Sequence, residues 1–414
     1  MADASLTRRI RADFPALQRR VNGHAAAFFD GPAGSQVPSA VIAAVSGYLA
    51  HRNANTHGAF ATSLETDEMI ETARARLATF LGAETFREIV FGANMTTLTF
   101  SLARVLAAEW GPGDEVVVTE LDHQANVEPW RRAAENAGAT VRCVPFDPSN
   151  GQLDLEALRS VVGPRTRLVA VGYASNALGT VNDVAHICGL AREAGALSFV
   201  DAVHFAPHGL IDVGAIGCDF LACSAYKFFG PHLGVLWGRL DLLERLRPWK
   251  LPPQQDEAPY RWETGTLPHE CIAGAAAAVE WISSLGEPGA GATDRARIAA
   301  GMQLIDGLEA PLFRRLVDGI ASIDGVRIFG PGLDVARTPT LGFTVAGASP
   351  RAVAERLGES GIFVWDGDFY ATTVIDRLGL RDSGGIVRVG MAPYNTPEEV
   401  DRLLAAVTAM RAGA

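Results

Sequence analysis

The chain has 414 residues, of which 48% are hydrophobic, and its formal net charge is −11 at pH 7. This length exceeds what one simple core supports and favours two or three domains, while the acidic balance argues against nucleic acid as a partner. No run of about 18 apolar residues occurs, so we predict no membrane-spanning segment and expect a soluble cytoplasmic protein.

The cysteines are few and dispersed. All five lie in apolar contexts and none forms a C-x-x-C pair (Cys143, Cys188, Cys218, Cys223 and Cys271). An odd, scattered set of this kind is typical of reduced, buried thiols, which favours a reducing compartment. We predict no metal site.

Short β-rich runs alternate with helical patterns through the first two thirds of the chain. Seven runs read as strands (88–92, 115–120, 140–146, 167–175, 197–203, 219–225 and 234–238). They are apolar without alternation, which is typical of a mostly parallel sheet with helices on both faces. We therefore predict a large α/β domain over residues 25–285 with a seven-stranded sheet, whose ligands bind beyond the carboxyl ends of the strands.

The pattern changes after residue 285. The stretch GEPGAGA at 286–292 is a break rich in glycine. A helical pattern follows at about 293–320, then runs that read as strands and helices, and finally a helix that opens with TPEE, a capping box. We predict a smaller α+β domain made of residues 1–24 and 286–414.

Polar residues that could take part in catalysis or ligand binding follow several of the expected strands. Asp201 closes a buried strand, and His204 comes three residues later. His123 follows the strand 115–120. In the turn GANMTT at 92–97, main-chain amides at a helix start and the Thr96 hydroxyl make an anion site. Taken singly, each feature also fits an ordinary structural role.

Lys227 gives these features a common chemistry. It ends an apolar run in CSAYKFFGPHLG, although lysine is normally a surface residue. A desolvated lysine has a lowered pKa and can form a Schiff base with an aldehyde. Asp201 can keep a pyridine nitrogen protonated, and the anion site can hold a phosphate. An aldehyde, a pyridine nitrogen and a phosphate together indicate pyridoxal 5′-phosphate (PLP).

Motifs spread over nearly the whole chain carry a family resemblance. They are FFDGPAGSQVPSAV, GDEVVVTELDHQANVEPW, YASNALGTVNDV, FVDAVHFAPHG, CDFLACSAYKFFGPHLGVLW, RWETGT and RVGMAPYNTPEEVDRL. The sequence resembles the fold-type I PLP enzymes of the class V aminotransferase family, in the branch of cysteine desulfurases and selenocysteine lyases. The resemblance implies an aspartate aminotransferase-like fold, PLP as cofactor, a small amino-acid substrate, and a homodimer with shared active sites.

The resemblance also assigns the cofactor contacts. Lys227 would bind PLP covalently and later move the proton at the substrate Cα, while Asp201 would pair with the pyridine nitrogen. His123 would stack on the ring face and exchange protons with substrate. His204 and Asn176 would contact the side of the ring. The phosphate would be held by four groups (the Met95 main chain, Thr96, Ser224 and Tyr226), and Thr266 would reach the phosphate in the partner subunit.

Other matched positions concern the substrate. Arg388 would grip the substrate carboxylate, a task that suits a bidentate guanidinium. Asn55, with His57 nearby, would form a wall of the pocket. Tyr370 is a further candidate for substrate binding.

The sequence departs from the family in the stretch GIFVWDGDFYATTVIDRLGL at 361–380. Desulfurases carry a nucleophilic cysteine here, in a motif like RxGHHC. In this chain Trp365 stands at the arginine position, Tyr370 falls at or near the cysteine position, and no cysteine follows Cys271. Persulfide formation needs an attacking thiolate, so we expect the standard desulfurase mechanism to be absent. Asp366 and Asp368 make this stretch either a solvated loop or a lid that selects substrate.

The reaction stays open at this point. We favour a β-elimination of the C–S lyase type, with transamination or epimerisation of an amino acid as alternatives. A non-catalytic PLP-binding regulatory protein is a further alternative. The joint presence of Lys227, Asp201, His123 and Arg388 argues against it, because a scaffold needs no such set.

Overall fold

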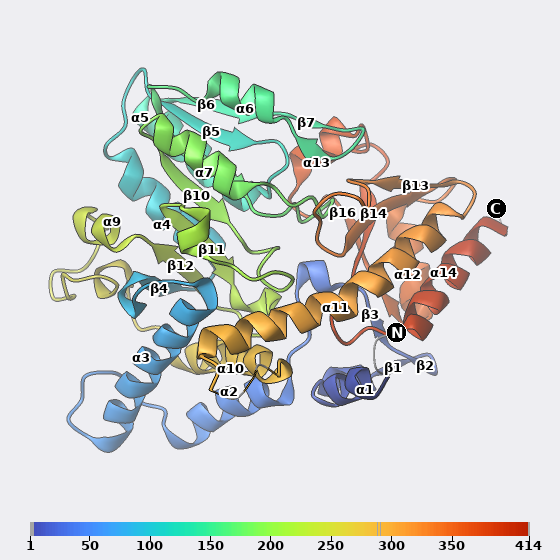
Figure 1. Ribbon diagram of the computed structural model, residues 1–414, viewed down its shortest axis with the longest axis horizontal. Helices are drawn as coiled ribbons and strands as arrows, with labels where there is room; N and C mark the ends of the chain where they lie inside the picture. The colour runs from blue at the N-terminus through green and yellow to red at the C-terminus, as the bar shows by residue number, and fades with distance from the viewer. Residues whose placement is uncertain (1–3, 288, 290, 413–414) are drawn as a thin grey trace.

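The computed structural model describes residues 4–287, 289 and 291–412. The remaining positions fall at the two ends of the predicted small domain and in the glycine-rich break, and so lie outside the described residues. Figure 1 shows two sheet-centred parts, with the helix α11 (Asp294–Ala321) running from one to the other.

The larger sheet has seven strands in the order β4-β12-β11-β10-β9-β5-β6. Only β12 runs against its neighbours. Each strand overlaps one of the seven predicted runs, and only β9 begins one residue before its run: β4 (Ile89–Gly92), β5 (Glu115–Thr119), β6 (Thr140–Val144), β9 (Thr166–Gly172), β10 (Leu197–Asp201), β11 (Phe220–Ser224) and β12 (Gly234–Gly238). The prediction of a mostly parallel seven-stranded sheet is therefore confirmed.

Apolar layers on both faces explain why these strands show no alternation. In β5, Val116 and Val118 pack into one core cluster while Val117 packs into another. The helices that cover or flank the sheet are α2 (Ser39–His51), α3 (Ala61–Leu81), α4 (Met95–Ala107), α5 (Glu128–Ala137), α6 (Leu155–Val161), α7 (Val184–Glu193), α8 (Val213–Ile216), α9 (Leu240–Arg245) and α10 (His269–Leu285). Both faces of every central strand are thus removed from water.

The smaller part is built on an antiparallel sheet with the order β13-β14-β17-β16. Its strands are β13 (Val326–Phe329), β14 (Thr340–Val345), β16 (Trp365–Gly367) and β17 (Ile386–Gly390), and its helices are α12 (Pro350–Glu359), α13 (Thr372–Arg377) and α14 (Pro397–Ala412). The first helix, α1 (Ala4–Ala12), packs Ile10 into the core cluster of the larger part. The predicted capping box exists, because Thr396 and Glu399 exchange hydrogen bonds of 3.2 and 3.3 Å at the start of α14. Sequence inspection did not predict β16, because a Trp-Asp-Gly run lacks a strand pattern.

Three pairs of short strands and six 3₁₀ turns complete the described structure. The pairs are β1 (Arg20–Val21) with β2 (His24–Ala25), β7 (Phe146–Asp147) with β8 (Gln152–Leu153), and β3 (Ala27–Phe28) with β15 (Ile362–Phe363). The 3₁₀ turns are η1 (Pro15–Gln18), η2 (Gly31–Ala33), η3 (Phe86–Glu88), η4 (Gln124–Asn126), η5 (Ala225–Lys227) and η6 (Tyr260–Trp262). Since β3 pairs with β15 and Asp30 forms a bridge with Gly390, the chain crosses between the parts close to the predicted boundary at residue 25. The domain limits themselves stay a prediction.

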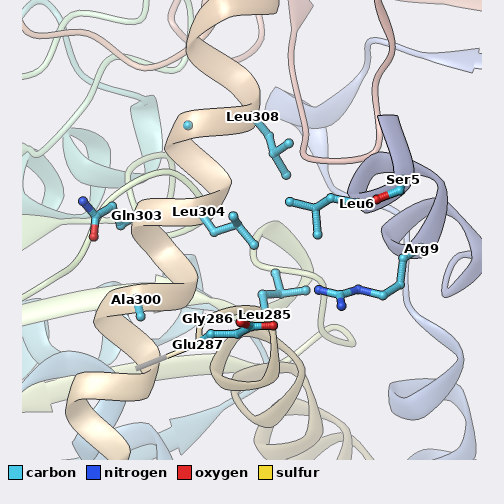
Figure 2. A pocket seen from close by; sticks show the side chains of 11 residues that line it. Ser5, Leu6, Arg9, Leu285, Gly286, Glu287, Ala300, Gln303, Leu304 and Leu308 are labelled. Carbon is cyan, nitrogen blue, oxygen red and sulfur yellow. The ribbon is translucent and has the colours of Figure 1, made fainter. Parts of the chain in front are cut away.

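A hollow of about 670 Å³ lies between α1, the end of α10 and α11. In Figure 2 the side chain of Leu6 from α1 faces Leu304 and Leu308 from α11, with Arg9 extending beside Leu285. No predicted site residue lines this hollow. Among the described residues, no helix is long and apolar enough to cross a membrane.

Candidate active site

A pocket of about 620 Å³ lies beyond the carboxyl ends of the central strands, where a ligand was expected. Eight of the predicted site residues line it: Met95, Thr96, His123, Asp201, His204, Ser224, Tyr226 and Lys227. They come from the ends of β5, β10 and β11 and from the start of α4. The fold therefore brings together residues that are up to 132 positions apart, from 95 to 227.

Lys227 is a buried amine. Its side chain follows β11, is only 9% exposed, and donates from Nζ to the main-chain oxygen of Pro32 at 2.5 Å. Burial lowers its pKa from 10.5 to about 7; the positive charge of Arg388 adds to this effect, and Asp201 opposes it. A large fraction of this lysine is therefore neutral and nucleophilic near pH 7.

Asp201 lies at the end of β10, and one of its carboxylate oxygens already accepts a hydrogen bond. Its Oδ1 accepts a 2.9 Å hydrogen bond from the Val203 amide. Burial raises its pKa to about 6, while the Val203 amide and the charge of Lys227 act in the opposite direction. A cationic partner would lower this pKa again and so stabilise the charged form of the carboxyl.

Asp122 is a second buried carboxyl in the pocket, and sequence inspection missed it. A Cβ at Gly172 would lie 2.3 Å from Asp122 Oδ1, and Gly172 is the register partner of Asp201 across β9 and β10. Burial and the nearby charge of Asp201 raise the pKa of Asp122 well above its usual range. Its position three residues after the buried strand β5, beside His123, was the signal that could have found it.

His123 begins the turn after β5 and is neutral at physiological pH. Its Nδ1 accepts a 3.0 Å hydrogen bond from the Ala125 amide, so the ring proton resides on Nε2. Burial lowers its pKa to about 4, helped by the charges of Lys227 and Arg388, while Asp368 opposes. A neutral imidazole with its proton on Nε2 can donate a hydrogen bond from that nitrogen to a ligand in the pocket.

His204 is held by threonines of the small domain. Its Nε2 lies 3.0 Å from the Thr340 hydroxyl and 3.2 Å from the Thr338 hydroxyl. Burial and the neighbouring His208 lower its pKa well below the usual range. The contact it was predicted to make with the ring stays a prediction.

The start of α4 forms the polar end of the pocket. Asn94 caps this helix by accepting from the Thr97 amide at 2.9 Å, and the Met95 amide donates to the Ser224 hydroxyl at 3.1 Å. A capped helix start with hydroxyl groups around it is suited to an anion. The Tyr226 ring stacks on His232 with centroids 5.2 Å apart, beside the same end.

Arg388 lies on β17 and is 3% exposed. Its Nη1 donates to the main-chain oxygen of Asn176 at 2.9 Å, and the Phe369 ring covers its guanidinium at 4.0 Å. Burial lowers its pKa to about 9, although the nearby Tyr226 and Asp30 act in the opposite direction. Asp30, which sequence inspection also missed, has its pKa raised to about 6 by burial.

The segment 365–371 closes the mouth of the site. The Gln124 amide donates to the Tyr370 main-chain oxygen at 2.7 Å, and Asn176 Nδ2 donates to that of Phe369 at 3.0 Å. The Tyr370 ring lies 5.5 Å from the His123 ring, although 71% of the residue is exposed. These contacts favour the lid interpretation over a solvated loop. They also place Asn176 against the lid, so its predicted contact with the cofactor ring stays a prediction.

Five predicted residues do not line this pocket. Asn176, Arg388 and Tyr370 make the lid contacts described above, whereas Asn55 and Thr266 lie elsewhere. Asn55 and Thr266, with His57, line a separate hollow of about 740 Å³. Its floor is the buried ion pair of Arg74 and Glu263, joined at 2.7 and 3.1 Å. Their predicted roles in a site shared between two subunits stay predictions.

Comparison with known proteins agrees with this geometry. The family model for class-V aminotransferases matches residues 27–403. This chain belongs to the aminotransferase class-V family. A cysteine desulfurase of Klebsiella pneumoniae is 33% identical over 422 aligned residues, which cover 97% of each chain.

Two solved structures resemble this chain over nearly its whole length. The apo cysteine desulfurase from Thermococcus onnurineus NA1 has a TM-score of 0.89 and 28% identity, with 100% of both chains covered. The cysteine desulfurase CsdA (S-sulfonic acid) from Escherichia coli has a TM-score of 0.84 and 28% identity, with 98% of both chains covered. The resemblance stated from the sequence is confirmed, and the protein is a PLP-dependent enzyme.

The residues of the pocket fit PLP. Lys227 supplies a desolvated amine for the aldehyde, and the buried carboxyl of Asp201 gains a cationic partner when it faces a protonated pyridine nitrogen. The start of α4 with Thr96 and Ser224 supplies donors for a phosphate. Each of the three groups of the cofactor thus has a matching residue in one pocket.

Proposed function

We propose that this enzyme removes the Cα proton of a small L-amino acid and eliminates a group from Cβ, as a C–S lyase does, without forming a protein persulfide. In the named relatives the activity is cysteine desulfuration. The proposal keeps their substrate class and changes the outcome of the reaction.

The positions of the cysteines carry this proposal. None of the five lines the Lys227 pocket or the hollow under the lid, and all five lie within the described residues. Cys223 faces the core behind the sheet, where burial raises its pKa far above the usual range. Cys143 and Cys271 are more exposed, yet burial and nearby carboxylates raise the pKa of both. Within one chain, therefore, none of the five cysteines offers a thiolate to a substrate in the Lys227 pocket.

The chain's own groups have defined tasks. PLP, when bound, supplies an aldehyde for Schiff-base formation and a ring that withdraws electrons from Cα. Asp201 holds the proton at the pyridine nitrogen, and Arg388 binds the substrate carboxylate. Lys227 Nζ takes the proton from Cα, and the His123 Nε2–H can donate a hydrogen bond to the departing group, which leaves as hydrosulfide with the electron pair of the Cβ–S bond.

The products distinguish the possible outcomes. Elimination from L-cysteine breaks the Cα–H and Cβ–S bonds, releases sulfide, and leaves an enamine that hydrolyses to pyruvate and ammonia. Desulfuration by a persulfide leaves L-alanine instead. Transamination would need a keto acid as acceptor, and epimerisation would return the D-amino acid.

The experiment is a product analysis with L-cysteine and L-cystine. We expect pyruvate and ammonia in equal amounts, unchanged in Cys143→Ser and Cys271→Ser. L-Alanine as the main product, together with a persulfide that one of these substitutions removes, would overturn the proposal and restore a desulfurase mechanism.

We further propose a homodimer in which the second copy covers the hollow that contains Asn55 and Thr266. Support comes from apolar side chains that are exposed on the adjoining helices α2 and α3 (Ile42, Leu49 and Leu64) and on the loop residue Phe60. Light scattering after size-exclusion chromatography tests the assembly. A monomer that binds PLP with full affinity would contradict the shared site.

A further inference from the structure

The guanidinium of Arg388 is enclosed but incompletely bonded. Phe369 covers one face with its ring centroid 4.0 Å from Cζ, and Nη1 donates to the Asn176 main-chain oxygen at 2.9 Å. Its Nε, although buried, has no acceptor within the described ranges 4–287, 289 and 291–412. A buried N–H without an acceptor is unfavourable, so this edge of the guanidinium is suited to an incoming carboxylate.

Phe369 is also part of the lid, and Asn176 holds it in place. Asn176 Nδ2 donates to the Phe369 main-chain oxygen at 3.0 Å, so Asn176 contacts both Arg388 and the lid. Phe369 and Tyr370 have φ values of 55° and 57°, which bulky residues rarely adopt. Such strained positions persist only where surrounding contacts hold them, and here the contacts come from Asn176 and from the Gln124 amide.

We propose that Phe369 is a positioning residue that couples recognition of the substrate α-carboxylate to closure of the lid, residues 365–371. The inference rests on the proposed function, in which Arg388 binds that carboxylate. The Phe369 ring attracts the guanidinium through its π face. A carboxylate that satisfies Nε keeps Arg388 beneath the ring. Without it, Arg388 and the lid gain hydrogen bonds by moving toward water.

This coupling selects amino acids over simple amines. A primary amine without a carboxylate can react at the cofactor but leaves Arg388 Nε unpaired. The lid then stays open to water during the reaction. The ligand class is therefore a small α-amino carboxylate rather than an alkylamine.

Hydrogen–deuterium exchange of the PLP-loaded enzyme tests the coupling. The probes are L-alanine, which has no leaving group at Cβ, and ethylamine, which is alanine without its carboxylate. L-Alanine should slow amide exchange in 365–376 by about fivefold or more, a typical coupling strength, and ethylamine should leave it unchanged. Cofactor absorbance, recorded in parallel, reports whether each probe has reacted.

Substitutions assign the effect to Phe369. Phe369→Ala should remove the protection by L-alanine while the absorbance change persists, and Phe369→Leu should retain part of it. Asp366→Asn is the matched control, because it changes another lid residue whose carboxylate pairs with Arg351 rather than with Arg388, and it should keep the protection. Phe369 is only partly buried, so these variants should fold.

The outcomes separate the two proposals. If L-alanine changes the absorbance but gives no protection, or if Phe369→Ala keeps the protection, the coupling is wrong and the proposed function stands. If neither L-alanine nor L-serine changes the absorbance, the proposed function fails, and the coupling fails with it.

Discussion

Replacing Lys227 with methionine should stabilise the cofactor-free protein. The chain has two lysines, Lys227 and Lys250. Burial lowers the pKa of Lys227 from 10.5 to about 7, so folding at neutral pH must desolvate or deprotonate an amine that is charged in the unfolded chain. Methionine has a similar length and carries no charge.

The size of the effect follows from proton linkage. Each tenfold change in proton affinity is worth about 1.4 kcal/mol, so a pKa of about 7 instead of 10.5 costs the folded state about 4 kcal/mol at pH 7. The unfolded state binds more protons between pH 7 and 10.5, and the stability of wild type therefore rises with pH over this window. Relaxation of the pocket and loss of the bond to Pro32 reduce the gain, so we expect about 2–4 kcal/mol at pH 7.

Urea unfolding of the cofactor-free proteins, followed by tryptophan fluorescence at pH 7 and pH 10, measures this difference. The advantage of Lys227→Met should shrink toward zero at the higher pH. Lys250→Met is the control, because Lys250 bonds only to Gln254 and Asp256 near the surface and should change little. A variant no more stable than wild type at pH 7, or an advantage that does not shrink with pH, would show that burial of the Lys227 amine does not destabilise the fold.

Four further predictions follow from the same geometry. Borohydride reduction of the PLP-loaded enzyme should attach the cofactor to the peptide that contains Lys227, which peptide mass spectrometry would show. Cofactor attached to Lys250 would contradict the assignment of Lys227 as the Schiff-base lysine. The rate at which the cofactor-free enzyme binds PLP should rise as the pH passes through about 7, where the Lys227 amine loses its proton. Stopped-flow absorbance measures this rate, and a rate that does not increase below pH 9 would mean that the lysine is exposed. Arg388→Ala should raise KM for every amino-acid substrate by about 10–100-fold, the worth of a charge-assisted hydrogen bond, with the cofactor band intact; a lost band would indicate a structural role. Gly172→Ala should destabilise the fold by about 1–3 kcal/mol, because its Cβ would lie 2.3 Å from Asp122 Oδ1, whereas Gly163→Ala, which meets open space, should not.

The sequence by itself determined the class of the fold and the chemistry of the cofactor. Seven apolar runs without alternation required a sheet covered on both faces, and all seven are strands. A lysine that follows such a run is desolvated, so the lowered pKa of the Lys227 amine is expected from the sequence alone. Asp201 and His123 also stand at strand ends, where local sequence position already places them near a ligand.

Only the tertiary structure decided how the lid and the carboxylate site are built. Phe369 and Arg388 are 19 positions apart, and Asn176 is more than 190 positions from either, so no local pattern links them. The same holds for Asp122, whose proximity to Asp201 depends on Gly172 of the strand between them. Periodicity records which residues are buried, because burial follows the geometry of each element. Contacts between elements depend on how the elements pack, and that information is spread over the whole chain.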